Sequence, residues 1–301
     1  MTGLPRFPDR DLTGYGRDRP DPNWPGGAKL AVNIVLNYEE GAENNILDGD
    51  AHSEHIVCEG AVSQPVIGGR DLLVESIYEY GSRVGVWNIF DEFASRGAPL
   101  TVYAVGLALK KNPAVGAAIR ENGFDCVSHG WRWIDYAKVP EKIEREHIRL
   151  CIETIRETTG ERPVGWYTGR ASLNTRRLVV EEGGFLYDSD AYNDDLPYFV
   201  EVDGKRHLIL CHNFDTNDTN FNRAPGTFTA DEYFAYLKSS IDYFRDRKKP
   251  GFLTIALHAR VIGRPGRMAA IQKLLDYVQG LDDVWLARRN DIARHWLEQQ
   301  G

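Results

Sequence analysis

The sequence has few cysteines: four in 301 residues, and no two of them spaced as Cys-x-x-Cys. Zinc ribbons need such pairs and small disulfide-held domains need more cysteine, so both classes are excluded. Positive charge is in deficit, because 36 lysines and arginines stand against 44 aspartates and glutamates and leave a net charge of −8. We therefore expect no nucleic-acid partner and no attraction to a membrane surface.

The chain also lacks an apolar leader. Its opening stretch, MTGLPRFPDRDLTGYG, has prolines and charges in place of the hydrophobic segment of a signal peptide. We expect a protein that is not exported and that works in the cytoplasm. The hydrophobic content of 42% is nevertheless enough for a large buried core.

Segments with the pattern of a strand alternate with segments with the pattern of a helix. Strands are expected within 29–40 and at 99–105, 124–128, 164–167, 185–187, 206–211, 252–257 and 284–287. Helices are expected at 78–96, 107–121, 139–159, 175–182, 231–247, 268–279 and 291–299. The alternation predicts an α/β fold, a distorted (β/α) barrel of seven or eight units. One barrel domain is expected over 29–301, with an N-terminal arm over 1–28 that packs on the barrel or on a neighbouring subunit.

Carboxylates and histidines recur just past the apolar runs, where barrels of this kind carry their chemistry. They are Glu39, Glu40, His129, Asp188, Asp190, His212 and His258. Successive side chains on a strand point to opposite faces, so the two glutamates share a pocket only if the strand ends there. Gly41 permits such an ending; the alternative is that the glutamates open a solvated loop.

Taken in order, these positions resemble the five motifs of the polysaccharide deacetylase family (NodB homology domain), distorted barrels that hydrolyse amide C–N bonds. Residues 37–40 (NYEE) stand in the place of the family's Thr-Phe-Asp-Asp, and 128–133 (SHGWRW) in the place of Ser-His-x-x-x-His. Residues 166–169 (WYTG) correspond to Phe-Arg-x-Pro, 188–190 (DSD) to the fourth motif and 257–258 (LH) to the fifth.

Two departures bear on a metal cofactor. In metal-dependent members of the family, the second acid of motif one and both histidines of motif two bind a divalent ion, whereas this chain has Glu40, His129 and Trp133 there. A catalytic zinc needs three protein ligands, so no cofactor is expected. The alternative is a divalent ion such as zinc on Glu40 and His129, with His52 or His55 of the long loop 41–76 completing its shell.

Segments such as LNYEEG, NILDGD, SHGWRWIDY and EEGGFLYDSD are similar to one branch of the family, the metal-independent bacterial allantoinases (PuuE type). The likeness covers residues 11–296. It implies hydrolysis of allantoin, a cyclic ureide, to allantoate in purine catabolism, and a homo-oligomer with a tetramer among the options. The alternatives are a cyclic-imide hydrolase, a metal-dependent amide deacetylase of the same fold, and a degenerate domain that binds carbohydrate without catalysis.

The resemblance implies roles for the residues at the strand ends. Glu39 is expected to activate water, with a pKa that Glu40 raises if the two lie close. Glu40 is expected to orient the water or a substrate N–H. His258 is expected to be the general acid, with Asp188 or Asp190 orienting its imidazole.

The remaining candidates concern binding. Three interpretations of His129 stay open: a vestigial metal ligand, a hydrogen-bond donor to the oxyanion, or a structural residue. Substrate contacts are expected from Trp133, Tyr167, Arg170, Asp190 and Asp215. Tyr167 stands where the family has an arginine, Arg170 offers a fork of donors, and Asp215 offers acceptors for ureido N–H groups. Arg260 is interpreted as a loop clamp, a subunit contact or a solvated residue.

Overall fold

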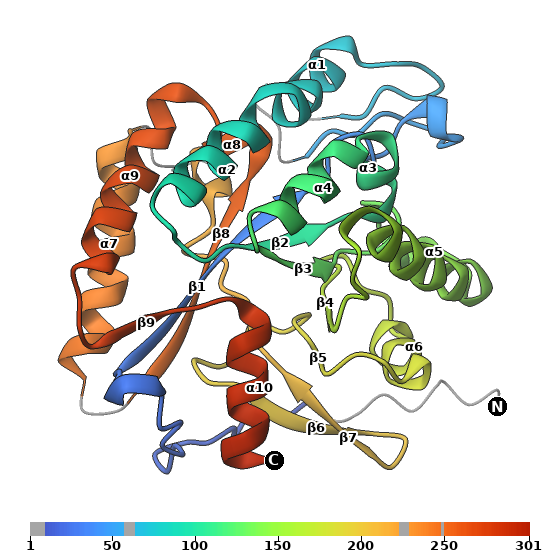
Figure 1. The fold of residues 1–301 in the computed structure, drawn as a ribbon. Coiled ribbons are helices and arrows are strands. Elements are labelled where there is room, and N and C mark those ends of the chain that lie inside the picture. The colour runs from blue at the N-terminus through green and yellow to red at the C-terminus, as the bar shows by residue number, and fades with distance from the viewer. Residues whose placement is uncertain (1–9, 57–63, 223–228, 248–249) are drawn as a thin grey trace.

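The computed structural model describes residues 10–56, 64–222, 229–247 and 250–301 (Figure 1). In this part of the chain a sheet of nine strands has the order β6-β7-β5-β4-β3-β2-β1-β8, and β9 adds to β1. Every neighbouring pair is parallel except the hairpin β6–β7. The expected α/β fold, with a curled and mostly parallel sheet, is confirmed.

The elements follow one another in the expected alternation. The strands are β1 (Leu30–Tyr38), β2 (Thr101–Ala104), β3 (Asp125–Ser128), β4 (Gly165–Trp166), β5 (Tyr187–Asp188), β6 (Tyr198–Val202), β7 (Lys205–Ile209), β8 (Gly251–His258) and β9 (Val284–Leu286). The helices are α1 (Leu72–Tyr80), α2 (Val86–Ser95), α3 (Gly106–Lys111), α4 (Pro113–Glu121), α5 (Glu141–Thr159), α6 (Thr175–Glu182), α7 (Ala230–Asp246), α8 (Ala259–Ile262), α9 (Pro265–Gln279) and α10 (Arg289–Gln300).

Strand β1 is buried along its whole length because it has a packed layer on each face. Its even-numbered residues from Leu30 to Leu36 join the cluster that lies under the helices, and Ala31 and Val35 join the cluster inside the barrel. Figure 1 shows helices around the outside of the sheet, with α7 and α9 side by side on one flank.

The register of the sheet brings four strand ends to one level. Asn37 of β1 lies opposite His258 of β8, and Tyr38 lies opposite Ala104 of β2. Ala104 in turn lies opposite Ser128 of β3. The residues that follow β1 and β3 therefore emerge beside the last residue of β8, which is where sequence analysis placed the chemistry.

Three local expectations were wrong. The helix expected at 78–96 begins at Leu72 and contains a π-helical turn, η3 (Gly81–Gly85), between α1 and α2. The helix expected at 107–121 divides at Asn112, because Pro113 starts a new helix as its first residue. Strand β6 was missed, although the Asp203-Gly204 turn that joins it to β7 has both residues at positive φ, a common hairpin signal.

Strands β7 and β8, at the two ends of the parallel part of the sheet, are joined by side chains rather than by a continuous ladder. Arg289, at the start of α10, donates through Nη2 to the carbonyl oxygens of Leu210 (2.7 Å) and Cys211 (2.8 Å). Its Nη1 donates to Thr254 Oγ1 on β8 at 2.9 Å and to Asn33 Oδ1 on β1 at 3.1 Å. The arginine therefore holds three strands around the inside of the barrel.

The described part of the N-terminal arm contacts the barrel. Tyr15 donates to Pro197 O, Arg19 pairs with Asp194, and the buried indole of Trp24 donates to Gly251 O. Residues 1–9 lie outside the described residues, and the division into arm and barrel stays a prediction. Over the described ranges, no helix has both the length and the apolar character needed to cross a membrane.

Candidate active site

Glu39 and Glu40 converge because β1 ends in a turn. Glu39 O accepts the amide of Ala42 at 2.9 Å, and Gly41 takes a left-handed conformation with φ of 89°. Any other residue type would be strained at that φ. Both carboxylates are buried. The solvated-loop alternative is wrong.

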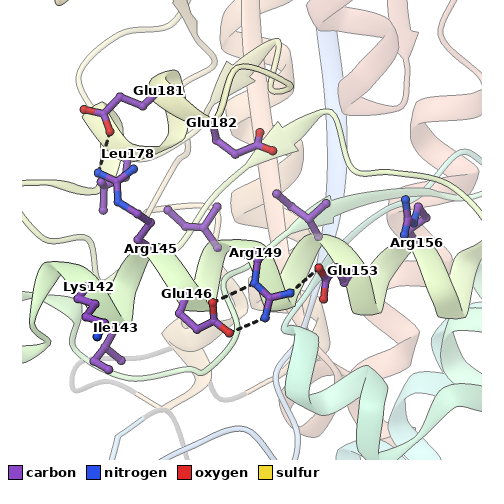
Figure 2. Close-up of a pocket in the computed structure, with 12 residues that line it drawn as sticks. Lys142, Ile143, Arg145, Glu146, Arg149, Glu153, Arg156, Leu178, Glu181 and Glu182 are labelled. Carbon is purple, nitrogen blue, oxygen red and sulfur yellow. Dashed lines mark hydrogen bonds and ion pairs between the residues drawn. The ribbon is translucent and has the colours of Figure 1, made fainter.

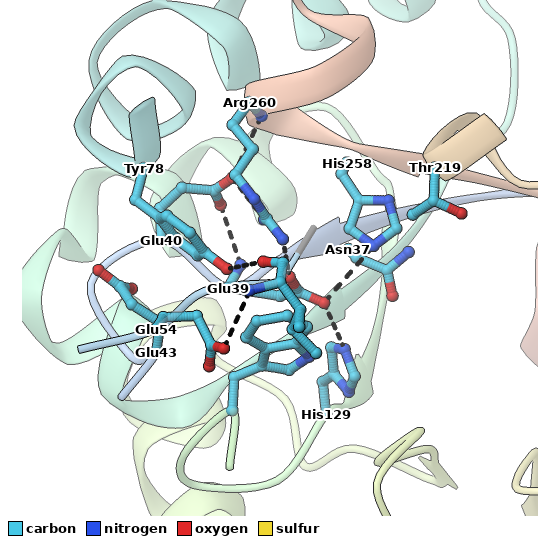
Figure 3. A network of polar contacts seen from close by, with 12 residues as sticks. Asn37, Glu39, Glu40, Glu43, Glu54, Tyr78, His129, Thr219, His258 and Arg260 are labelled. Atoms are coloured by element: carbon cyan, nitrogen blue, oxygen red, sulfur yellow. Dashed lines mark hydrogen bonds and ion pairs between the residues drawn. The ribbon is translucent and has the colours of Figure 1, made fainter. Parts of the chain in front are cut away.

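Glu39 lies at the centre of a group of charged and imidazole side chains (Figure 3). Its Oε1 is 3.1 Å from His129 Nε2 and 3.6 Å from His258 Nε2. Its Oε2 accepts a hydrogen bond from Arg260 Nη2 at 2.7 Å. His129 Nδ1 faces Tyr167 O at 3.2 Å.

Arg260 was missed as a site residue. It lies in α8, directly after β8, and its side chain is 0% exposed, so the solvated interpretation is wrong. Its Nη1 and its backbone N–H both donate to Glu40 Oε1 at 3.2 Å. The guanidinium lies over the ring of Tyr78, with 4.1 Å between Cζ and the ring centroid. One cation thus pairs with both glutamates.

The π-helical turn η3 makes room for this arrangement. A Cβ on Gly81 would lie 2.4 Å from Glu40 Oε1 and 2.8 Å from the amide nitrogen of Arg260. A Cβ on Gly85 would lie 2.0 Å from the carbonyl oxygen of Ala259. Two glycines therefore let the α1–α2 segment close over α8, and π-helical turns are often found at functional sites.

The two carboxylates have opposite pKa shifts. Burial raises the pKa of Glu39, but Arg260, His258 and His129 outweigh it and hold that pKa well below its usual range. Burial also raises the pKa of Glu40; Arg260 opposes this, but the charge of Glu39 adds to it, and the result is a raised pKa. The expectation that Glu40 raises the pKa of Glu39 is wrong, because Arg260, His258 and His129 favour the ionised form of Glu39.

His258 takes its orientation from Asp218. Its Nδ1 lies 2.7 Å from Asp218 Oδ1, and its backbone N–H donates to Asp218 Oδ2 at 2.6 Å. Asp218 begins the short 3-10 helix η5 (Asp218–Asn222). The carboxylate fixes Nδ1 as the protonated nitrogen and leaves Nε2 directed at Glu39. The prediction that Asp188 or Asp190 orients this imidazole is wrong.

Both aspartates are engaged elsewhere. Asp188 accepts from Arg176 Nε at 2.8 Å and lies 3.2 Å from His207 Nε2. Burial opposes ionisation of Asp188, but Arg176 and His207 lower its pKa overall. Asp190 accepts the amides of residues 168 and 169, and burial together with the charge of Asp188 raises its pKa to about 7.

The expected binding residues are distributed unevenly. Trp133 is buried between two guanidinium groups, with its ring centroid 4.7 Å from Arg170 Cζ and 5.3 Å from Arg260 Cζ. Arg170 donates to Glu54 and to the carbonyl of Trp133. Tyr167 stacks on His129, with centroids 4.9 Å apart. Asp215 is exposed and accepts from Tyr236.

The residues do not fit the alternative of a divalent ion. Glu40 accepts hydrogen bonds from Arg260 and from the backbone N–H of Glu39, so protein donors already occupy it. The guanidinium beside the two glutamates would repel a second cation. His52 faces Ser53 O and His55 lies beside Glu54, and no three His, Cys, Asp or Glu of the described ranges group as metal ligands.

Two hollows are lined by none of the strand-end histidines. The larger, about 730 Å³, lies between α5 and α6 and is lined by paired charges such as Arg149 with Glu146 and Glu153 (Figure 2). It contains none of the strand-end histidines or carboxylates. The smaller, about 280 Å³, reaches Glu40 and Glu43 from the side of α1 and η3. The volume of a hollow alone therefore does not identify the active site.

Comparison with known proteins gives the family. The polysaccharide deacetylase family model matches residues 71–185. A Schizosaccharomyces pombe protein that carries the provisional name of a polysaccharide deacetylase is 39% identical, over 96% of this chain and 97% of its own. Two solved structures are each 49% identical, cover 97% of this chain and 98% of theirs, and have TM-scores of 0.94.

One of these structures is described as a probable polysaccharide deacetylase from Pseudomonas aeruginosa PAO1, and the other is a Puue allantoinase. Their likeness extends over almost the whole chain. The chain belongs to the polysaccharide deacetylase family and is a hydrolase that acts on carbon–nitrogen bonds.

Proposed function

We propose that the protein opens the hydantoin ring of allantoin by hydrolysis and releases allantoate. The observation that supports this most is the 49% identity to a Puue allantoinase over 97% of the chain. The buried group of Glu39, Arg260, His129 and His258 supplies chemistry suited to the reaction. A cytoplasmic location and a homo-oligomer stay predictions from the sequence.

The reaction needs a group that accepts a proton from water, a donor to the leaving nitrogen and donors to the developing oxyanion. Water attacks a ring carbonyl, its oxygen bonds to the carbon, and the carbon–nitrogen bond of the ring breaks. The leaving nitrogen is conjugated to a second carbonyl, so it departs more readily than an alkyl amine. This lowers the demand for an electrophilic cation at the carbonyl.

Glu39 is the group placed to bind the attacking water. Its lowered pKa keeps it ionised, so it accepts a hydrogen bond from water throughout the neutral range. The same low proton affinity means that the proton does not rest on Glu39. The proton passes to the leaving nitrogen, and His258 Nε2, 3.6 Å from Glu39 Oε1, is the nearby carrier.

Asp218 and Glu40 support these two groups without touching the reacting atoms. Asp218 holds the tautomer of His258 and stabilises the imidazolium that forms during transfer. Glu40 holds Arg260 against Glu39, so its role is to position the cation rather than to orient water or a substrate N–H. Trp133 and Tyr78 cover the guanidinium and keep it from water.

The test is turnover of allantoin by protein treated with a chelator, with succinimide and dihydrouracil in parallel. We expect allantoate from allantoin and little product from the other two. Glu39→Gln should lower kcat/KM by roughly a thousandfold or more, since it removes the ionised hydrogen-bond acceptor that binds the attacking water. Glu201→Gln, an exposed change on β6, should leave the rate unchanged.

Three outcomes would contradict the proposal. Turnover of succinimide with allantoin left intact would assign the protein to cyclic imides. Activity that appears only after zinc is added would point to a metal-dependent amide hydrolase. Carbohydrate binding with no hydrolysis of any of the three compounds, unchanged in Glu39→Gln, would indicate a domain without catalysis.

A further inference from the structure

His212 lies at the same edge of the barrel as the candidate active site, and its imidazole makes ring contacts there. It follows β7, and its backbone N–H donates to Ala191 O at 2.8 Å. The residue is 1% exposed, and neither ring nitrogen has a hydrogen-bond partner within the described ranges. A buried imidazole with both nitrogens unsatisfied is costly, and such groups in native proteins usually have a function.

The imidazole of His212 is neutral. Burial lowers its pKa, and the neighbouring Arg289, His258 and His129 lower it further, to well below its usual range. A neutral imidazole offers one N–H donor and one acceptor nitrogen. It can therefore bind a group that has both a carbonyl and an N–H, and it does not attract an anion.

Aromatic contacts connect His212 to Glu39. Its ring stacks on Tyr167 with centroids 4.8 Å apart, and Tyr167 stacks in turn on His129 at 4.9 Å. His129 is the histidine that contacts Glu39. His212 is therefore two stacked rings away from the carboxylate that binds water, within the same layer of side chains.

Two exposed aromatic residues border His212 on the solvent side. Tyr192 and Phe214 stack on each other at 4.5 Å, and they are 40% and 45% exposed. The ring centroids of Tyr192 and His212 are 5.9 Å apart in a T-shaped arrangement. The hydroxyl oxygen of Tyr192 lies 3.1 Å from that of Tyr167. A pair of exposed stacked rings is a suitable wall for a flat polar group.

We propose that His212, walled by Tyr192 and Phe214, forms a subsite for the ureido arm of the substrate. The arm is flat and carries one carbonyl and several N–H groups, which match the donor and the acceptor of a neutral imidazole. The hydantoin ring then lies toward Glu39 and His258, with the arm toward His212. This assignment rests on the proposed function, because allantoin carries such an arm and simple cyclic imides do not.

The test is His212→Phe, which keeps an aromatic ring in the stack and removes both nitrogens. We expect KM for allantoin to rise about tenfold, the loss of roughly one or two neutral hydrogen bonds, while kcat changes less than about threefold. Hydantoin, which lacks the arm, should inhibit the wild type and the variant with the same Ki. His295→Phe is the matched control, since His295 also packs on an aromatic ring, that of Trp24 at 5.3 Å.

A thermal melt of His212→Phe checks that it folds, and Phe214→Ala, an exposed change, gives a second route to a raised KM if it does not. An unchanged KM for allantoin in folded variants would overturn the subsite, since the nitrogens would then serve only buried water or packing. A Ki for hydantoin that rises as much as KM would also overturn it. A wild type that opens no allantoin would refute the proposed function, a separate result seen before any variant is made.

Discussion

Two arginines of the described ranges are completely buried, and their surroundings differ in one respect. Arg260 and Arg289 are both 0% exposed. Arg260 donates to the carboxylates of Glu39 and Glu40. Arg289 donates hydrogen bonds to neutral oxygens, among them Ser189 Oγ and two main-chain carbonyls.

The difference shows what each cation does. Beside carboxylates, a buried guanidinium changes which of them holds a proton, so Arg260 sets the chemistry of the site. Among neutral acceptors, a buried guanidinium donates hydrogen bonds to oxygen atoms of several strands. Arg289 therefore holds the barrel together. Burial of a charged residue therefore does not identify an active site; the charge of its partners does. The predictions below test this distinction, beginning with the largest effect.

Arg289→Met should destabilise the fold by about 3–5 kcal/mol, because it leaves the carbonyls of Leu210 and Cys211 and several side-chain acceptors without a donor. Urea unfolding measures the change. Arg288→Met is the control, since its partly exposed side chain pairs with Asp291, and it should cost about 1 kcal/mol or less. Equal effects of the two changes would mean that Arg289 does not join the strands.

Arg260→Met should lower kcat/KM by about a thousandfold, because the cation that keeps Glu39 ionised is lost. The pH dependence of its stability should also change. In the wild type the lowered pKa of Glu39 adds stability above the unfolded pKa, and this is lost as pH falls. In the variant the lowering by Arg260 is absent, so less stability should be lost as pH falls below 4.5, the usual pKa of the group.

The control for this change is Arg267→Met. Arg267 follows α8 and donates to the carbonyl of Val261. The Arg267→Met variant should retain the activity of the wild type and the pH dependence of its stability. Thermal melts at several pH values, together with steady-state kinetics, separate the two variants, and a fully active Arg260→Met would remove Arg260 from the site.

Glu43→Gln concerns a carboxylate that is buried beside the candidate active site. Burial raises the pKa of Glu43 from 4.5 to about 7, although the amide of Gly41 donates to it at 2.6 Å. Folding therefore disfavours ionised Glu43, and stability falls as pH rises from 4.5 to about 7. The substitution should raise Tm by about 2 °C or more at pH 8 and much less at pH 5.

Glu79→Gln is the control for this smallest effect, because Glu79 lies on the same wall of the hollow but is 62% exposed. Its Tm should match the wild type at both pH values. A Glu43→Gln variant that is less stable at pH 8 would mean that the ionised carboxylate is favoured in the fold, contrary to its burial.

Much of the fold and half of the site were predictable from the sequence. Strands alternate with helices, and side chains past the strand ends face one edge, so Glu39, His129 and His258 could be placed together. Arg260 and Asp218 could not, because they lie in short elements, α8 and η5, that have no periodic pattern. Arg260 also sat among other arginines, which favoured a surface interpretation.

Asp188 shows the limit of reasoning from strand ends. It lies at the end of β5, as expected, but its position along the sheet was not visible in the sequence. Arg176 and His207 come from neighbouring elements and pair with it first. Predicting which of several carboxylates meets His258 requires the curvature of the sheet, and this depends on tertiary packing rather than on local pattern.

The pairing of β1 with β8 has a consequence for synthesis of the chain. Eight residue pairs join a strand that ends at Tyr38 to one that begins at Gly251. During translation the apolar β1 therefore emerges long before its partner, and contacts between such distant segments form slowly. A nascent chain that has not reached Arg260 exposes this strand and has no site, so chaperone dependence should be greatest before the final helices are made.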